Sequence, residues 1–263
     1  MRNSINDKVI YITGGSKGIG FGIARVLLAS GAKVAISSRS LEAAQSAAAE
    51  LGPNVLGIQS DVASLEAEKN AIQKVVEHFG KLDVLVANAG VGHFAPIDVI
   101  SEKEWHDTIN TNLTGTIQMV HRFLPHLLRQ RSAAIINVSS GIAFMPYSSA
   151  PVYSASKAGV RAYTQALRLQ LEDTNVKVME MIPPGVNTNL QNDWAVKPNP
   201  SQMMDVDKMV SVVIKGLQND KKELKPVLIS VLAFLSRLIP GALLKFGHRE
   251  FKKFTGTAKH ALR

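Results

Sequence analysis

A tyrosine and a lysine four residues apart are the side chains of this sequence best suited to proton transfer. Tyr153 and Lys157 belong to the segment Tyr-Ser-Ala-Ser-Lys, and residues four apart share one face of a helix. A free phenol has a pKa of about 10, which makes it a poor proton shuttle at neutral pH. A neighbouring ammonium favours the phenolate and brings that pKa towards the working range. The pair indicates acid–base chemistry, although its spacing alone is common by chance.

A glycine-rich segment near the N-terminus is suited to binding a pyrophosphate. Thr13–Gly20 reads TGGSKGIG and lies between a β-branched run and a helical pattern. Glycines let the backbone turn sharply and approach phosphate closely, and the helix N-terminus favours negative charge. A flexible turn would show the same cluster, but this position in the chain favours a dinucleotide. The residues expected to contact it are Gly14, Ser16, Lys17, Gly18, Ile19 and Gly20.

The residues that follow the second predicted strand indicate which dinucleotide binds. An acid at this place would hydrogen-bond the ribose 2′-hydroxyl of NAD, but here Ser38 stands there and Arg39 follows. Arg39 and Lys17 are both suited to a 2′-phosphate, because guanidinium forms forked contacts with phosphate oxygens. Two solvated surface cations are the alternative. The missing acid and the two cations together predict NADPH (NADP+) in preference to NADH.

Asp61 and Val62 follow the third predicted strand, at the carboxyl edge of the sheet where an adenine would be held. An Asp at this place would equally well cap the next helix. From the sequence, both alternatives stay open.

These residues need a scaffold, and the chain alternates short β-branched runs with longer amphipathic segments, which is typical of repeated βαβ units. Most of the strands are apolar on both faces, as strands covered by helices on two sides should be. The predicted fold is α/β, a doubly wound parallel sheet of seven strands or fewer, in a Rossmann-like three-layer sandwich. The predicted strands are Val9–Thr13, Lys33–Ser37, Val55–Gln59, Val84–Ala87, Ala134–Val138 and Val176–Ile182.

Helix boundaries are indicated by caps and stop signals. One helix is predicted over Ile19–Ala29. Ser40 caps a second that ends at Leu51, Ser64 opens a third that ends at Phe79, and Ser101–Glu104 has the form of a capping box.

Five motifs in this order resemble those of the short-chain dehydrogenase/reductase superfamily, over about residues 7–190. They are TGGSKGIG at 13–20, NAG at 88–90, NTNLTG around Asn112, NVSS ending at Ser140, and YSASK at 153–157. The resemblance implies hydride transfer between a nicotinamide dinucleotide and a carbonyl or alcohol carbon, which requires no metal.

The resemblance also implies a role for each motif residue. Tyr153 would give or take the proton at the carbinol oxygen, and Lys157 would tune it and hold the nicotinamide ribose. Ser140 would hydrogen-bond the substrate carbonyl, and Asn112 would support a water-linked proton relay that reaches Lys157. Tyr153 and Lys157 would also border the cofactor, and the further residues that the resemblance places around it are Asn88, Ala89, Gly90, Pro183, Val186 and Thr188.

The sequence departs from the family pattern after the sixth predicted strand. The family usually has Pro-Gly-x-Val-x-Thr, and Pro183–Thr188 fits if Pro184 replaces the glycine. Pro184 has no N–H and a fixed φ, which sets this loop apart. Val186 would then contact the nicotinamide carboxamide through its backbone, and Thr188 through its hydroxyl.

The composition predicts one globular domain with a distinct C-terminal extension. The 263 residues are 46% hydrophobic and include no cysteine, which excludes disulfides, thiolate catalysis and cysteine-ligated zinc. The formal charge of +9 is uneven, because residues 1–220 carry 20 basic and 19 acidic side chains and residues 221–263 carry 10 and 2. A nucleic-acid groove would need cations across the main body, so no nucleic acid is expected. The N-terminus is too polar for a secretory signal, and we expect a cytoplasmic protein.

Mostly apolar segments surround the expected reaction centre, which favours an uncharged substrate. Trp194 would belong to a lid over it, although such residues are more often ordinary packing. Histidines are scattered singly without metal-ligand spacing, and no metal is expected. The residues expected to face the substrate are His93, Phe144, Tyr147 and Trp194.

The apolar run over residues 225–246 is divided by Arg237 and by Pro240-Gly241, which argues against a membrane span. Two alternatives stay open. The extension would pack on the domain or on a partner subunit of a homodimer or homotetramer, or residues 226–253 would lie on anionic lipid. The cations at the headgroups would be Lys245, Arg249, Lys252 and Lys253.

The sequence thus predicts an NADPH-dependent reductase of an aldehyde or ketone. Two alternatives are an NAD-dependent alcohol dehydrogenase and a nucleotide-sensing regulator that binds NADPH without turnover. The Tyr153–Lys157 pair speaks against the regulator, which has no need of it.

Overall fold

A seven-stranded parallel sheet forms the centre of the computed structural model, which describes residues 5–95, 97–191 and 199–254. Its strand order is β3-β2-β1-β4-β5-β6-β7, so the direction of winding reverses between β1 and β4. The strands are β1 Val9–Thr13, β2 Lys33–Ser38, β3 Val55–Gln59, β4 Val84–Ala87, β5 Ala133–Val138, β6 Val176–Met181 and β7 Glu223–Leu224.

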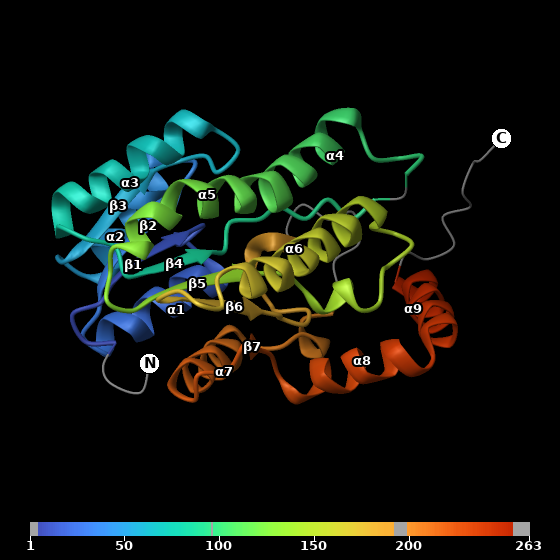
Figure 1. Cartoon of the computed structure of the whole chain (residues 1–263). Helices are drawn as coiled ribbons and strands as arrows, with labels where there is room; N and C mark the ends of the chain where they lie inside the picture. The colour runs from blue at the N-terminus through green and yellow to red at the C-terminus, as the bar shows by residue number, and fades with distance from the viewer. Residues whose placement is uncertain (1–4, 96, 192–198, 255–263) are drawn as a thin grey trace.

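Helices cover both faces of the sheet and complete a three-layer sandwich (Figure 1). Helices α1, α2 and α7 pack on one face, and α3, α5 and α6 on the other. The helices are α1 Gly18–Ala29, α2 Leu41–Leu51, α3 Leu65–Phe79, α4 Glu102–Ile109, α5 Gly115–Leu128, α6 Pro151–Gln170, α7 Val206–Gln218, α8 Val227–Leu238 and α9 Pro240–Phe254. The predicted doubly wound α/β fold is confirmed.

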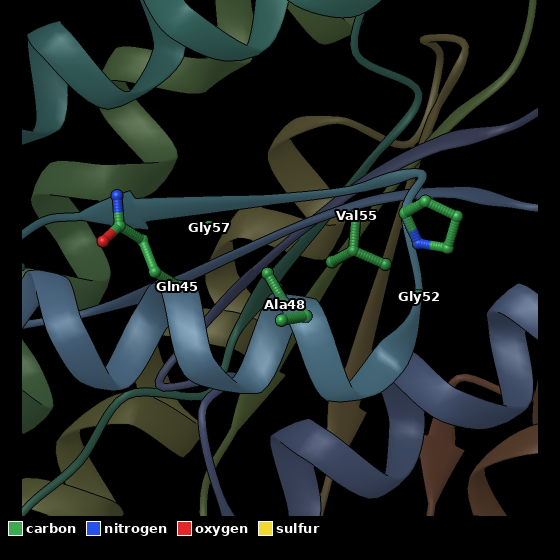
Figure 2. Close-up of a pocket in the computed structure, with 7 residues that line it drawn as sticks. Gln45, Ala48, Gly52, Val55 and Gly57 are labelled. Carbon is green, nitrogen blue, oxygen red and sulfur yellow. The ribbon is translucent and has the colours of Figure 1, made fainter.

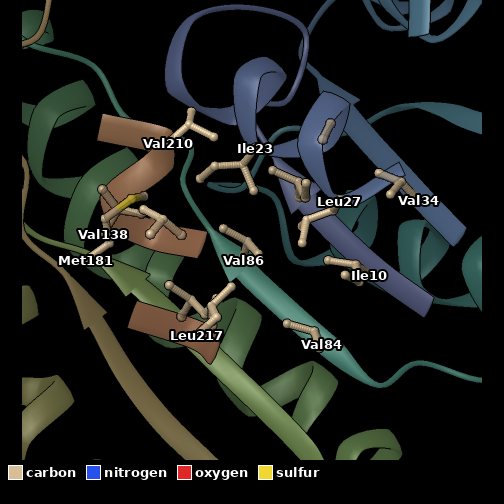
Figure 3. Packing of buried hydrophobic residues seen from close by; sticks show 14 of the residues in the cluster. Ile10, Ile23, Leu27, Val34, Val84, Val86, Val138, Met181, Val210 and Leu217 are labelled. Carbon is tan, nitrogen blue, oxygen red and sulfur yellow. The ribbon is translucent and has the colours of Figure 1, made fainter. Parts of the chain in front are cut away.

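The strands are apolar on both faces because each face has its own core. In β1, Ile10 and Ile12 join the cluster with α1 and α7, whereas Val9 and Tyr11 join the cluster on the opposite face. Figure 3 shows the first cluster, where Ile10 and Val86 of the sheet lie beneath side chains of α1 and α7. Burial of this kind contributes roughly 1.5–3 kcal/mol for each large aliphatic side chain.

Most element boundaries agree with the sequence predictions, and the differences are small. β2 extends to Ser38, β5 begins at Ala133, β6 ends at Met181 rather than Ile182, and α1 begins at Gly18. β7 is a two-residue strand that pairs with β6 and carries no recognisable strand pattern.

The predicted caps at Ser40, Ser64 and Ser101 are confirmed by hydrogen bonds from backbone N–H groups to their hydroxyls. One alternative was wrong: the cap of α3 is Ser64 and not Asp61. Asp61 instead accepts a 3.0 Å hydrogen bond from the backbone N–H of Ala63, within the turn before the helix.

One turn of π-helix, Asn110–Thr114, joins α4 to α5 and carries Asn112. The widened turn interrupts the regular hydrogen-bond ladder, and such turns often occur at functional sites. Asn112 is fully buried there.

Candidate active site

Nearly all of the predicted site residues follow the carboxyl ends of the strands. The glycine segment follows β1, Ser38 ends β2 and Arg39 follows it, and Asn88 follows β4. Ser140 comes two residues after β5. Because the strands are parallel, these ends meet at one edge of the sheet, and the winding reverses there between β1 and β4. This is the place where doubly wound sheets bind ligands.

The glycine loop has the geometry of a phosphate cradle. Gly14 and Gly18 have φ angles of 62° and 58°, in the left-handed region that glycine adopts without strain. At Gly20 a Cβ atom would lie 2.6 Å from the Gly14 carbonyl oxygen and 2.6 Å from Asn88 Nδ2. The backbone is therefore packed as closely as glycine allows, and the N-terminus of α1 follows directly. These features fit a dinucleotide pyrophosphate.

Asn88 supports this loop from the neighbouring strand end. Its Nδ2 donates to the carbonyl oxygens of Thr13 at 2.9 Å and Gly14 at 3.2 Å. The hydroxyl of Thr13 accepts hydrogen bonds from the backbone N–H groups of Asn88 and Ala89, at 3.1 and 3.0 Å. Thr13 was not among the predicted site residues, and only the position of its motif at the strand end could have indicated this bracing role.

The two cations expected at the adenosine end lie on the surface of this edge. Lys17 and Arg39 are exposed, and neither forms an ion pair with the residues that the structure describes. Ser38, the last residue of β2, is half-buried. Val62 is buried in the core against Gly115 of α5. The end of β2 thus carries a serine followed by an arginine, where a carboxylate would bind a ribose hydroxyl.

Helix α6 presents Tyr153 and Lys157 from one face, next to Ser140. The Lys157 ammonium lies 5.8 Å from the centre of the Tyr153 ring and donates a 3.0 Å hydrogen bond to the Val138 carbonyl oxygen at the end of β5. The Ser140 hydroxyl lies close enough to the phenol to lower its pKa. All three predicted residues therefore meet at one point.

Burial shifts the pKa values of both groups on α6. It raises the pKa of Tyr153 to about 12, and the hydrogen bond with Ser140 acts in the opposite direction. Burial lowers the pKa of Lys157 to about 8. Burial therefore favours the neutral form of both groups, and the pKa of Tyr153 moves away from the working range rather than towards it as the sequence predicted.

Asn112 approaches the same group from the π-turn. Its side chain exchanges two 2.9 Å hydrogen bonds with the backbone N–H and C=O of Val91, and it donates to Ser156 Oγ at 3.1 Å. A Cβ at Gly90 would lie 3.2 Å from Asn112 Oδ1 and 3.5 Å from Lys157 Nζ. Asn112 and Lys157 therefore both lie next to Gly90. The four predicted residues Asn112, Ser140, Tyr153 and Lys157 thus lie at the same edge of the sheet.

The loop after β6 is held by a residue that the sequence did not indicate. The buried Gln191 donates to the Val186 carbonyl oxygen at 2.9 Å and accepts a hydrogen bond from the Thr188 backbone N–H at 3.2 Å. Thr188 also lies opposite Gly18, where a Cβ would come within 3.3 Å of its methyl group. The loop thus closes over the glycine segment despite Pro184.

The predicted substrate residues do not all lie together. Tyr147 packs in a small apolar cluster with Tyr153, Phe94 and Ile142, and the Phe94 ring lies 5.0 Å from the Tyr153 ring. His93, the residue before Phe94, instead lies near α4.

His93 Nδ1 lies 3.7 Å from Glu104 Oε1 of α4. Phe144 lies against Arg161, whose guanidinium carbon is 4.3 Å from the centre of the ring. Phe94, whose ring lies against Tyr153, is therefore closer to the candidate reaction centre than His93 or Phe144. Trp194 lies outside the described residues.

A surface hollow with a volume of about 330 Å³ lies between α2 and the start of β3 (Figure 2). Ala48, Gly52 and Val55 are among the residues that line it. It lies at the amino end of β3, away from the edge that carries the polar groups, and its lining offers no charged side chain.

We expect Gly20→Ala to weaken dinucleotide binding about tenfold or more. The new methyl group would press on the Gly14 carbonyl and on Asn88, and such overpacking costs roughly 1–3 kcal/mol. Titration of the cofactor by fluorescence measures the change. Gly241→Ala is the matched control, because nothing lies within 4 Å of its added Cβ. Equal affinity of the two variants would contradict the close packing of the loop.

Known proteins share both the sequence and the fold. A family model described as short chain dehydrogenase matches residues 8–199. The chain is 34% identical over 223 residues to an uncharacterized oxidoreductase DltE of Bacillus subtilis, which covers 84% of this chain and 88% of that protein. Human 15-hydroxyprostaglandin dehydrogenase (NAD+) is 35% identical over 221 residues, 80% of each chain. A short chain dehydrogenase of Burkholderia cenocepacia, solved with NADP, has a TM-score of 0.81 at 25% identity over 93% of this chain and 98% of that chain.

Proposed function

We propose, because the chain belongs to the short-chain dehydrogenase/reductase superfamily, that it is an NADPH-dependent reductase of an apolar aldehyde or ketone. Membership of the superfamily itself makes it an NAD(P)-dependent oxidoreductase of hydroxyl and carbonyl groups. The observation that carries the proposal is the proximity of Tyr153, Ser140 and Lys157 to one another, at the same edge of the sheet as the glycine loop. NADPH would supply the hydride, and the side chains would supply orientation and the proton.

Each of the four residues has a task that its position supports. Ser140 would hydrogen-bond the substrate carbonyl oxygen and hold it beside Tyr153, whose hydroxyl would protonate that oxygen as the hydride arrives. Lys157 would stabilise the resulting phenolate electrostatically and hold the nicotinamide ribose. Asn112, fixed by Val91 and Ser156, would hold a water chain through which the phenolate regains its proton.

The remaining predicted cofactor residues surround the same edge. The glycine loop would contact the pyrophosphate of the cofactor, and Asp61 and Val62 would contact its adenine. Ala89 and Gly90 would line the nicotinamide ribose, and Pro183, Val186 and Thr188 the carboxamide. Phe94, Ile142 and Tyr147 would form the apolar substrate wall beside Tyr153.

NADPH preference is expected to depend on Arg39. We expect Arg39→Gln to raise the Kd for NADPH about tenfold and to leave that for NADH unchanged, because only NADPH offers a phosphate to the guanidinium. Lys33→Gln, which removes an exposed cation at the opposite end of β2, is the control. Equal effects on the two cofactors would contradict the assignment.

A specific observation favours the NAD-dependent alternative: the human relative, 35% identical, is named for NAD+. An NAD-dependent alcohol dehydrogenase would use the same four residues in the oxidative direction, with Tyr153 as the base. The decisive measurement is the oxidation of NADPH and of NADH against a panel of carbonyl compounds. Binding of NADPH without turnover of any compound would instead support the regulator.

The proposed organisation follows the charge distribution. Residues 1–220 would form the catalytic domain and residues 221–263 an appended apolar, basic extension, in a cytoplasmic homodimer or homotetramer. Size-exclusion chromatography with light scattering tests the assembly.

A further inference from the structure

Helix α8 turns an apolar stripe outward, away from the sandwich. Val227, Val231, Phe234 and Leu238 follow the spacing of one helical face. They are 80%, 49%, 62% and 61% exposed, whereas Ile229 on the opposite face is buried. A surface helix of a globular domain ordinarily shows the reverse pattern. The stripe therefore indicates a partner that the domain itself does not provide.

Helix α9 exposes two further apolar side chains, and cations lie on both helices. Leu244 and Phe246 are 45% and 55% exposed. Arg237 is exposed at the edge of the stripe, and Lys245 and Arg249 are exposed on α9. The sequence has no acidic residue between Glu223 and Glu250, so this surface, which we name the α8–α9 face, is apolar and positively charged. Figure 1 shows both helices outside the layers of the sandwich.

We propose that the α8–α9 face docks on the surface of an anionic lipid bilayer. The bilayer supplies an apolar layer for the stripe and negative headgroups for the cations, as for other interfacial helices. A second copy of the chain fits less well. In a symmetric pair the same surface meets itself, so Arg237, Lys245 and Arg249 would approach identical cations.

The helices would lie along the membrane rather than cross it. Within the described residues, neither α8 nor α9 nor any other helix has the length and hydropathy of a bilayer span.

The α8–α9 face is joined to the loop that follows Ser140. Ile229 packs on Gly141, where a Cβ would come within 2.6 Å of its Cδ1, and Ser148 Oγ lies 2.7 Å from His248 Nδ1 in a hydrogen bond. A docked enzyme would therefore hold one wall of its substrate site next to the lipid. This consequence rests on the proposed reductase function, and it indicates a carbonyl compound that partitions into the membrane.

Co-sedimentation of the full chain with vesicles tests the docking without cofactor or substrate, so its outcome is independent of the reductase proposal. We expect binding to vesicles of phosphatidylcholine with phosphatidylglycerol, loss of binding at high salt, and little binding to phosphatidylcholine alone. Replacing Arg237, Lys245 and Arg249 by Gln should weaken binding about fivefold per cation. Lys69→Gln with Lys74→Gln, on exposed positions of α3, is the charge control.

Val231→Ser with Phe234→Ser tests the stripe, and Leu169→Ser on α6, where Leu169 is 71% exposed, is its control. Thermal unfolding followed by circular dichroism shows whether each variant is folded. If the stripe variant is unfolded, the charge variants alone test the docking. Docking is refuted if the wild-type protein does not bind anionic vesicles. It is also refuted if neither the charge substitutions nor the stripe substitutions lower binding relative to their controls. A stripe variant that only dissociates an oligomer would assign the face to a second copy instead.

Discussion

Replacing Tyr153 by Phe should lower kcat for carbonyl reduction by about 10³-fold, because a positioned general acid contributes roughly 10²–10⁴-fold. The substitution removes one oxygen atom and keeps the ring, which packs against Phe94 and Ile142. The wall of the site and the fold should therefore persist. Steady-state oxidation of NADPH with the best carbonyl compound of the panel measures the loss, and cofactor titration should show an unchanged Kd.

Tyr163→Phe on the same helix is the matched control. Tyr163 is half-buried, and burial raises its pKa to about 12 as well, but it lies nearly three turns beyond Tyr153 and packs against the core on that face of the sheet. We expect this variant to keep full activity. If Tyr153→Phe also stayed active, the proton would have to come from another group and the proposed mechanism would fail.

Stability should fall as the pH rises through neutrality, and Glu68 is the expected cause. Glu68 of α3 is fully buried, accepts one 2.8 Å hydrogen bond from Ser60 Oγ through Oε1, and has no partner at Oε2 among the described residues. Burial raises its pKa to about 7, the charge of Asp61 acts in the same direction, and the bond from Ser60 opposes both. The protonated form is therefore the one that the core accepts.

The direction of the pH dependence follows from proton linkage. The folded state holds the Glu68 proton up to about pH 7, whereas the unfolded chain releases it near the ordinary value of 4.5. The stabilisation is complete below about pH 4.5 and is lost as the pH rises towards and through 7. Shifts of this size correspond to about 3 kcal/mol.

Glu68→Gln should therefore be more stable than wild type by up to about 3 kcal/mol at pH values above 7, with little difference at acid pH. Urea unfolding at a series of pH values measures this. Glu66→Gln, an exposed position in the first turn of the same helix, should leave the pH profile unchanged. A Glu68→Gln profile parallel to that of wild type would show that another group causes the dependence.

The glycine loop and the group on α6 could be predicted from the sequence because their signals are local. A strand, a run of glycines and a helix start within a few residues of each other, and Tyr153 and Lys157 are one helical turn apart. Serine caps at Ser40 and Ser64 are similarly local, which is why those helix starts were predicted correctly. The family resemblance rested on the same short segments, and the family match over residues 8–199 confirms it.

Only the tertiary structure decided features that depend on residues far apart in the chain. Phe94 rather than His93 lies against Tyr153, because a loop after β4 meets the N-terminal end of α6. Phe144 lies on Arg161, whose guanidinium also binds Glu180 at 2.7 Å and Glu223 at 3.0 Å. Contacts of this kind join β6, β7 and α6, and no sequence pattern contains them.

The sequence by itself determined the sandwich, the nucleotide edge and the types of the reacting groups, since periodicity, glycines and caps act over a few residues. The structure decided which way each surface faces. A composition of Val, Phe and Leu with Arg237 is compatible with a helix that packs inward or outward. The packing of Ile229 on Gly141 and the burial of Ala233 fix the rotation of α8. That rotation, set by contacts across almost ninety residues of chain, exposes the apolar stripe.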